Sequence, residues 1–168
     1  MLQAILFTTG VGMKFITLGD WGGMGLGGYQ ADTAMRVAKQ LESTASHNNV
    51  QFVINTGDNF YYCGITNTSD PQVSTDFLQP YSGKSLQVPW YGVLGNHEYG
   101  YNVDAQISLT TKIPNWVIED RYYTKRLPLA DSGMHVSFIF IDTSPCVQDY
   151  RDSDASKWDP CGSMFPTC

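Results

Sequence analysis

The sequence has little positive charge and no apolar run long enough to cross a membrane. Its 10 Lys and Arg residues stand against 16 Asp and Glu residues, so the formal net charge is -6. Nucleic acid is therefore an unfavourable partner, because phosphate backbones are held mainly by basic side chains. Since no apolar run reaches about 18 residues, the sequence predicts no transmembrane helix.

Disorder is excluded as well, because only 15% of the residues are charged and 42% are hydrophobic. A chain of 168 residues has the size of one domain and can bury a sizeable core. We assign that domain to residues 13–168. Residues 1–12 begin with an apolar stretch that no basic residue precedes, and we interpret them as a leader or the remnant of a signal peptide.

Cysteine is scarce, and no pair has the C-x-x-C spacing that would indicate zinc. Disulfides between loops are the better interpretation of the four cysteines, which are Cys63, Cys146, Cys161 and Cys168. Asn67-Thr68-Ser69 matches the acceptor sequence for N-glycosylation, which makes Asn67 the expected glycan site. These features predict a protein of the secretory pathway, lysosomal or extracellular.

Apolar, β-rich runs bounded by Gly, Pro and Asn predict four buried strands. They span residues 14–18, 50–55, 90–94 and 135–141. Residues 30–48 carry small and apolar side chains at helical spacing, and a shorter helix is expected over 73–78. Strand, helix and strand in this order favour a right-handed crossover in a largely parallel sheet, so the fold class is α/β. Residues 142–168 show no sustained period and are expected to form a long loop.

Three of the predicted strands end in a glycine that is followed by a polar side chain. The three ends are Leu18-Gly19-Asp20, Thr56-Gly57-Asp58-Asn59 and Leu94-Gly95-Asn96-His97. Glycine allows a sharp turn or a close approach, and the next residue can then place a ligand at the carboxyl edge of the sheet. One such Asp is usually a turn former or a helix cap. Three recurrences indicate a site for hard cations, and two neighbouring metals can clamp a phosphoryl group.

The residues at these strand ends resemble a known family. The first three motif blocks of the calcineurin-like metallophosphoesterases are similar to Gly19-Asp20-Trp21-Gly22-Gly23, Gly57-Asp58-Asn59-Phe60-Tyr61 and Gly95-Asn96-His97-Glu98. The Trp after the first Asp and the Asn-Phe-Tyr after the second resemble the purple acid phosphatases of the small, tartrate-resistant type. This resemblance implies the N-terminal part of one metallophosphoesterase domain, a β-sandwich flanked by helices that is incomplete in this chain.

The resemblance also implies an acid phosphatase that hydrolyses phosphate monoesters, with a phosphorylated small molecule or protein as substrate. A metal-activated hydroxide would attack phosphorus at a dinuclear centre of Fe(III) and a divalent metal, which is Fe, Zn or Mn. Asp20 and Tyr61 would bind the ferric ion, and Asp58 would bridge both metals. Asn96 would bind the divalent metal, and His97 would donate a hydrogen bond or a proton to the leaving group. A phenol suits this role only beside a strong Lewis acid.

Part of the family's ligand set has no match in the chain. The family pattern needs further histidines in a Gly-His and a Gly-His-x-His block, but His47 and His135 lie outside any such block. We therefore expect the remaining ligands to come from sequence beyond Cys168. The 168 residues alone are expected to bind metal weakly, to show little activity and to leave apolar surface exposed.

Two smaller departures concern single positions. Glu98 and Tyr99 follow His97 where mammalian tartrate-resistant members have Asp and His, which leaves the leaving-group preference and the pH optimum open. Cys146 resembles the family's disulfide cysteine. Its partner would lie beyond the chain, and Cys161 or Cys168 is the local alternative.

Two other functions compete with the phosphatase. Residues 23–28 match the G-x-G-x-x-G pattern of dinucleotide-binding folds, but the preceding strand ends at Leu18 and no acidic residue ends the second strand. A phosphatase-like module that binds phosphate or a phosphorylated partner without turnover is the other alternative. The missing histidines favour such a module, whereas the retained aspartates and His97 favour the enzyme.

Overall fold

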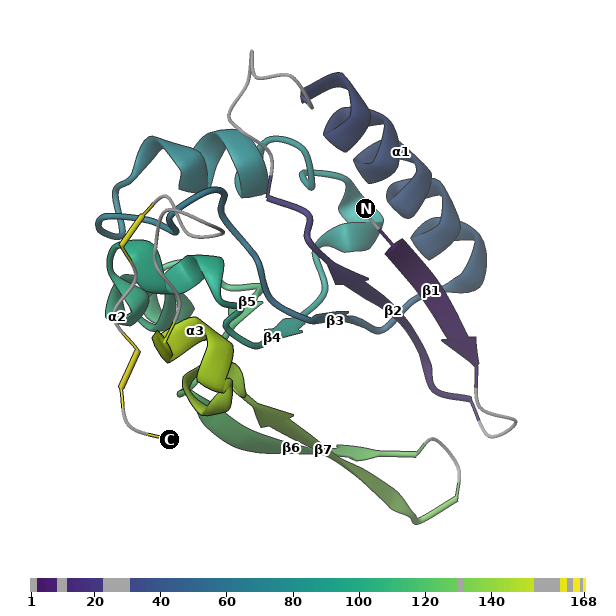
Figure 1. Ribbon diagram of the computed structural model, residues 1–168. Coiled ribbons are helices and arrows are strands. Elements are labelled where there is room, and N and C mark those ends of the chain that lie inside the picture. The colour runs from purple at the N-terminus through teal and green to yellow at the C-terminus, as the bar shows by residue number, and fades with distance from the viewer. Residues whose placement is uncertain are drawn as a thin grey trace.

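Figure 1 shows the computed structural model, which describes residues 3–8, 12–22, 31–129, 132–152, 161–162, 165–166 and 168. A five-stranded sheet has the order β1-β2-β3-β4-β5, and a two-stranded sheet contains β6 and β7. The first sheet consists of β1 (Gln3–Thr8), β2 (Lys14–Gly19), β3 (Phe52–Asn55), β4 (Trp90–Gly92) and β5 (Trp116–Val117). The second consists of β6 (Tyr122–Pro128) and β7 (His135–Ile141).

Helices connect and flank these strands. The α-helices are α1 (Ala31–Asn48), α2 (Val103–Ser108) and α3 (Gln148–Asp152), and a π-helix spans Val73–Leu78. Short 3-10 turns span Lys84–Leu86, His97–Gly100, Leu109–Thr111 and Ser144–Cys146. None of the helices in the described ranges is both long and apolar enough to cross a lipid bilayer.

The parallel part of the large sheet confirms the predicted crossover. β2 pairs in parallel with β3, β3 with β4 and β4 with β5, whereas β1 pairs antiparallel with β2. Helix α1 connects β2 to β3 and buries Ala38, Leu41 and Ala45 in the main core. Both faces of β3 are covered, which explains why its sequence is an unbroken apolar run up to Asn55.

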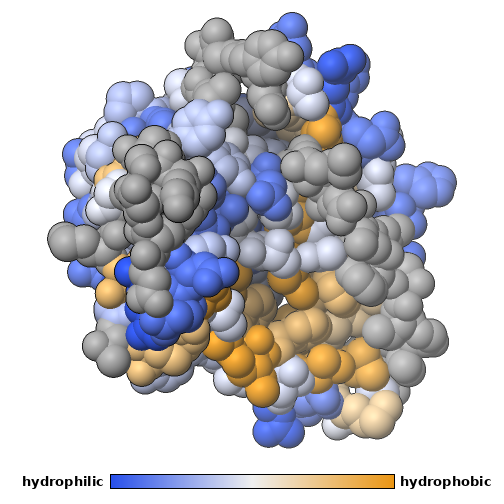
Figure 2. All heavy atoms as spheres, viewed as in Figure 1, coloured by the Kyte–Doolittle hydropathy of each residue, from blue (hydrophilic) through white to orange (hydrophobic). Residues whose placement is uncertain are grey.

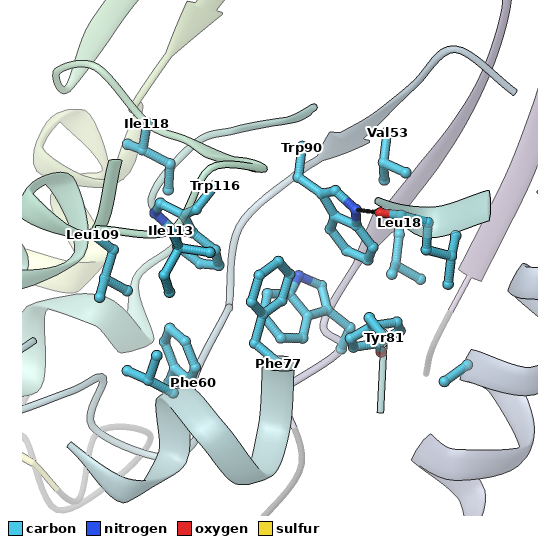
Figure 3. Packing of buried hydrophobic residues seen from close by; sticks show 14 of the residues in the cluster. Leu18, Val53, Phe60, Phe77, Tyr81, Trp90, Leu109, Ile113, Trp116 and Ile118 are labelled. Carbon is cyan, nitrogen blue, oxygen red and sulfur yellow. Dashed lines mark hydrogen bonds between the residues drawn. The ribbon is translucent and has the colours of Figure 1, made fainter. Parts of the chain in front are cut away.

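The core beside this sheet is dominated by aromatic rings (Figure 3). The Trp21 ring lies 5.5–6.1 Å, between centroids, from five other rings. These neighbours are Phe60, Phe77, Tyr81, Trp90 and Trp116. Large buried rings contribute most of the apolar area of a core, so this cluster fixes the loops that begin at Asp20 and Asp58.

The two-stranded sheet covers the other face of the large sheet. β6 and β7 pair antiparallel from Tyr122↔Ile141 to Pro128↔His135. Phe138 of β7 packs edge-on against Phe15 and Phe52 of the large sheet, with ring centroids 5.7 and 5.4 Å apart. Two sheets packed in this way, flanked by helices, form the predicted metallophosphoesterase-type sandwich.

One strand prediction was wrong about burial. Residues 135–141 form a strand, but it belongs to the two-stranded sheet and is exposed on one side. The alternation of His135, Ser137 and Ile139 with half-buried positions is typical of a strand that packs on one face. Figure 2 shows apolar side chains gathered over the lower part of the molecule, where Figure 1 places β6 and β7.

The chain after β7 is more structured than predicted. Residues 144–146 form a 3-10 turn and α3 follows at Gln148–Asp152, while residues 153–160 lie outside the described part. Disulfides join Cys63 to Cys161 and Cys146 to Cys168. The prediction of disulfides is confirmed, with Cys168 as the local partner of Cys146.

The N-terminal residues contain a strand that the sequence did not indicate. Residues 3–8 form β1, which pairs with β2 along its whole length. The interpretation of residues 1–12 as a leader or signal-peptide remnant stays a prediction.

Candidate metal centre

The three glycine-containing strand ends meet at one edge of the large sheet, because β2, β3 and β4 run parallel. Asp20 and Asp58, which follow β2 and β3, both have φ 52°, a left-handed conformation that non-glycine residues rarely adopt. The Asp20 N–H donates to the carbonyl of Gly57 (3.2 Å), so the two bends are joined directly. Backbone strain of this kind concentrates at functional sites.

Glycine is required where the loop after β4 contacts the loop after β3. A Cβ atom on Gly95 would lie 2.1 Å from Asp58 Oδ1 and 2.4 Å from the Asp58 backbone nitrogen. Gly57 has φ 99°, and a Cβ there would lie 2.8 Å from the nitrogen of Gly95. The predicted close approach at these glycines is therefore present in the structure.

Three oxygen-bearing side chains from two of the loops converge at this edge. The Tyr61 hydroxyl donates to Asp20 Oδ1 (2.7 Å) and lies 3.1 Å from Asp58 Oδ2. Burial, and then the hydrogen bond to Asp20, raise the pKa of Tyr61 well above its ordinary value. Burial also raises the pKa of Asp58, although the charge of His97 opposes that shift.

His97 lies against the same group. Its backbone N–H donates to Asp58 Oδ1 (3.3 Å), and its ring centroid is 4.5 Å from that of Tyr61. Nδ1 lies 2.7 Å from the carbonyl oxygen of Tyr62. A carbonyl can only accept, so Nδ1 carries the hydrogen and Nε2 is the ring nitrogen left for a substrate.

The remaining predicted residues fall into two places. Asn96 is half-buried between Gly95 and His97 at the start of a 3-10 turn, and its side chain makes no capping hydrogen bond. Asn67 lies in an exposed turn between Tyr61 and Asn96, where its Oδ1 accepts from the Ser69 N–H (2.8 Å). The amide of Asn67 is thus on the surface, and its glycosylation stays a prediction.

Sequence reasoning assigned no role to Glu98, which is fully buried beside these loops. Its carboxylate accepts hydrogen bonds from the backbone N–H groups of Asp58, Asn59, Phe60 and Gly95. Burial, and then the charge of Asp58, raise the pKa of Glu98, while the backbone N–H groups of Gly95, Phe60 and Asn59 lower it. A carboxylate beside His97, between Gly95 and Gly100, was the only available signal.

A chain of hydrogen bonds between buried side-chain amides supports the loop after β3. The role of these residues was not identified from the sequence either. Asn55 Oδ1 accepts from Trp21 Nε1 (2.9 Å) and from the Gly57 N–H (3.2 Å). Asn55 Nδ2 donates to Asn59 Oδ1, and Asn59 Nδ2 donates to Gln106 Oε1 (3.1 Å). These bonds tie the polar edge of the sheet to the aromatic core beneath it.

Tyr99 lies in the His97–Gly100 turn and has a structural position there. It is 5% exposed, and its hydroxyl donates to Asp142 and accepts from the Arg121 guanidinium. The residue after Glu98 therefore anchors the His97–Gly100 turn to the segment that follows β7.

The oxygen donors at the sheet edge fit a metal ion only in part. Within the described ranges, no group of three or more His, Cys, Asp or Glu side chains is arranged to hold an ion. The set at the sheet edge instead contains two carboxylates and a phenol, Asp20, Asp58 and Tyr61, joined by hydrogen bonds. Hard oxygen donors of this kind fit a small, highly charged cation, although they are too few to enclose two ions.

Comparison with known proteins defines the family. Residues 13–159 match the family model described as calcineurin-like phosphoesterase, so the chain belongs to this family. It is 38% identical over 138 residues to purple acid phosphatase 7 of Arabidopsis thaliana, a match that covers 82% of this chain and 39% of that protein. It is 30% identical over 132 residues to human tartrate-resistant acid phosphatase type 5, covering 78% of this chain and 41% of that protein.

The fold is shared with a solved structure described as GAP50, the anchor in the inner membrane complex of Plasmodium. The TM-score is 0.68 at 23% sequence identity, over 83% of this chain and 44% of that chain. The chain spans about two fifths of the length of the two acid phosphatases named above.

Proposed function

We propose that this chain carries the metal-binding loops of an acid phosphatase that hydrolyses phosphate monoesters. The observation that carries the proposal is the convergence of Tyr61 with Asp20 and Asp58 at the carboxyl edge of a parallel sheet. Support comes also from the similarity to acid phosphatases, whose names state their activity. Substrates would be phosphorylated small molecules or proteins.

The proposed cofactor is a dinuclear centre of Fe(III) and a divalent Fe, Zn or Mn ion. Asp20 and Tyr61 would hold the ferric ion, Asp58 would bridge the two metals, and Asn96 would hold the divalent one. When bound, the metals would supply an activated water and neutralise the charge of the phosphate. Ligands beyond these residues would be needed to complete both coordination shells.

His97 would act on the leaving group through Nε2. Because Nδ1–H is committed to the Tyr62 carbonyl (2.7 Å), only the imidazolium form carries a hydrogen on Nε2. A proton placed from that form on the leaving oxygen lowers the barrier to its departure. The contact between the His97 N–H and Asp58 Oδ1 keeps this ring beside the metal-binding carboxylates.

The proposed setting is the secretory pathway, with a lysosomal or extracellular destination. Two disulfides support it, because disulfides persist mainly in oxidising compartments. A glycan on the exposed Asn67 would be in keeping with the same route.

The first test is binding of metal and phosphate to the oxidised chain. We expect calorimetry to show weak binding of Fe(III) with Zn(II), followed by binding of inorganic phosphate, and both should be lost in Asp58→Asn. Asp32→Asn removes one carboxylate from the exposed start of α1 and should bind as the wild type does. Equal binding by Asp58→Asn and the wild type would overturn the proposal.

The second test is turnover of phenyl phosphate at acidic pH. We expect slow phosphate release from the metal-loaded 168-residue chain and faster release from any longer natural form that contains it. His97→Asn should lose turnover and keep phosphate binding, because it removes the proton donor and leaves the metal ligands intact. Unchanged turnover in His97→Asn would contradict the assigned role.

A further inference from the structure

Glu98 joins the loop after β3 to the loop after β4. Its Oε1 accepts from the backbone N–H groups of Asn59 (2.7 Å) and Phe60 (3.2 Å). Its Oε2 accepts from those of Asp58 (3.0 Å) and Gly95 (2.6 Å). One side chain thereby satisfies backbone donors from two separate loops.

A carboxylate is the side chain that fits this arrangement. An ionised carboxylate only accepts, and its two oxygens offer about four lone-pair positions, which matches the four donors. A glutamine of the same shape would direct an NH₂ group at one pair of N–H donors, so some of the bonds could not form. An apolar residue would leave all of these buried donors without an acceptor.

The connection between the loops runs in both directions. The Asp58 backbone donates to Glu98, while Asp58 Oδ1 accepts from the His97 N–H (3.3 Å). The loops are also in van der Waals contact at Gly95, where a Cβ atom would overlap Asp58. The distance between Asp58 and His97 is therefore set by a closed ring of contacts that includes the Glu98 carboxylate.

We propose that Glu98 is a positioning residue, which fixes the Asp58 loop relative to the Asn96-His97 loop so that their side chains can share one metal centre. This inference rests on the proposed function. Glu98 touches neither metal nor substrate, because its side chain is fully buried beneath the loops. Its effect would reach the centre only through the placement of Asp58 and its neighbours.

The test compares metal affinity in two variants of Glu98 at neutral pH, at a temperature where circular dichroism shows each of them folded. Glu98→Gln keeps the shape and loses one acceptor, and we expect it to bind the Fe(III) and Zn(II) pair roughly tenfold to a hundredfold more weakly. Glu98→Asp keeps the acceptors on a shorter stem and should recover part of the affinity. Loss in Glu98→Gln with partial recovery in Glu98→Asp supports a positioning role.

A matched control is available in Glu42 on α1, whose carboxylate accepts from the Ser85 N–H (3.1 Å), a hydrogen bond remote from the strand ends. Glu42→Gln should leave metal affinity unchanged. If folded Glu98→Gln binds metal as tightly as the wild type, the inference is wrong. If the wild type itself binds no metal, the proposed function fails, and the role of Glu98 in it fails too.

A second measurement covers the case in which Glu98→Gln does not fold. In the wild type, the amide protons of Asp58, Asn59, Phe60 and Gly95 should be shifted downfield in NMR spectra and protected from exchange. In Glu98→Asp these signals should move together, and the metal affinity should fall with them. Unprotected amides in the wild type, or signals that do not move while affinity falls, would overturn the proposal.

Discussion

The carboxyl edge of the five-stranded sheet and the β6–β7 hairpin are built in opposite ways. At the edge, the backbone bends sharply at Asp20, Gly57 and Asp58, all with positive φ, and polar side chains face one another. The hairpin is regular, with an unbroken antiparallel register, and large apolar side chains are exposed on its outer face. Tyr122 and Ile139 on that face are 74% and 70% exposed. Oxygen ligands for a metal converge at the sheet edge, where the backbone is bent. Apolar side chains stay exposed on the hairpin, where the backbone is regular.

The two regions also differ in what supports them. The edge rests on the buried cluster around Trp21 and on a ladder of buried amides that begins at Asn55. The hairpin rests on a few rings, with Phe15 stacked on Phe52 and touching Phe138. Substitutions at the edge should therefore lower the free energy of unfolding far more than substitutions on the hairpin's outer face.

The largest expected effect comes from removing the ring beneath the edge. Trp21→Ala deletes a fully buried indole in contact with five rings, and should lower the free energy of unfolding by about 4 kcal/mol. Tyr122→Ala removes an exposed ring of the hairpin and should change it by about 0.5 kcal/mol or less. Urea unfolding of the oxidised chain measures both, and similar losses in the two variants would refute the comparison.

A smaller loss of stability is expected when one methyl group is added in each region. Gly95→Ala places a Cβ atom 2.1 Å from Asp58 Oδ1 and should cost about 3 kcal/mol, because the two loops must separate. Gly133→Ala lies in the hairpin turn at φ 68°, where the new Cβ would meet no atom within 4 Å. Only backbone strain acts there, so we expect a loss of about 1 kcal/mol in thermal unfolding. An equal loss at both glycines would show that the loops are not in tight contact.

The smallest expected effect is on the way the stability depends on pH. Burial works to raise the pKa of Asp70, but hydrogen bonds from Thr66 and the Gln72 N–H outweigh it and lower that pKa. A lowered pKa means stability that is present above the unfolded value near 3.8 and is lost as the pH falls through the folded pKa. Because Asp70 is largely solvated, we expect a few tenths of a kcal/mol. In Asp70→Asn, the free energy of unfolding should fall less steeply in acid than it does in the control Asp32→Asn. The same slope in both variants would refute this contribution of Asp70.

β2, β3, β4 and α1 could be predicted from the sequence because their apolar spacing is unambiguous. β6 could not, since Thr124, Lys125 and Arg126 interrupt its apolar pattern and it is covered on one face only. β7 was predicted to be buried because five of its seven residues, including Phe138 and Phe140, are apolar, which masks the polar positions on its outer face. One-sided strands give weaker signals than strands buried on both faces.

The candidate site could be predicted from the sequence for a different reason. Asp20 and Asp58 each follow a strand and a glycine, so their place at the sheet edge follows from topology alone. The role of Glu98 could not be predicted, because no spacing rule shows that a carboxylate faces backbone donors of another loop. Hydrogen bonds between loops depend on the folded backbone, and the sequence pattern does not encode them directly.

The most direct test of the central claim is the visible absorption of the chain titrated with Fe(III). If Tyr61 binds the ferric ion together with Asp20, the wild type should develop a charge-transfer band of the phenolate. Tyr61→Phe should bind iron without that band, while Tyr62→Phe, which alters the exposed neighbour, should keep it. A band of unchanged position and intensity in Tyr61→Phe, or none in the wild type, would contradict the assignment of this sheet edge as the metal centre.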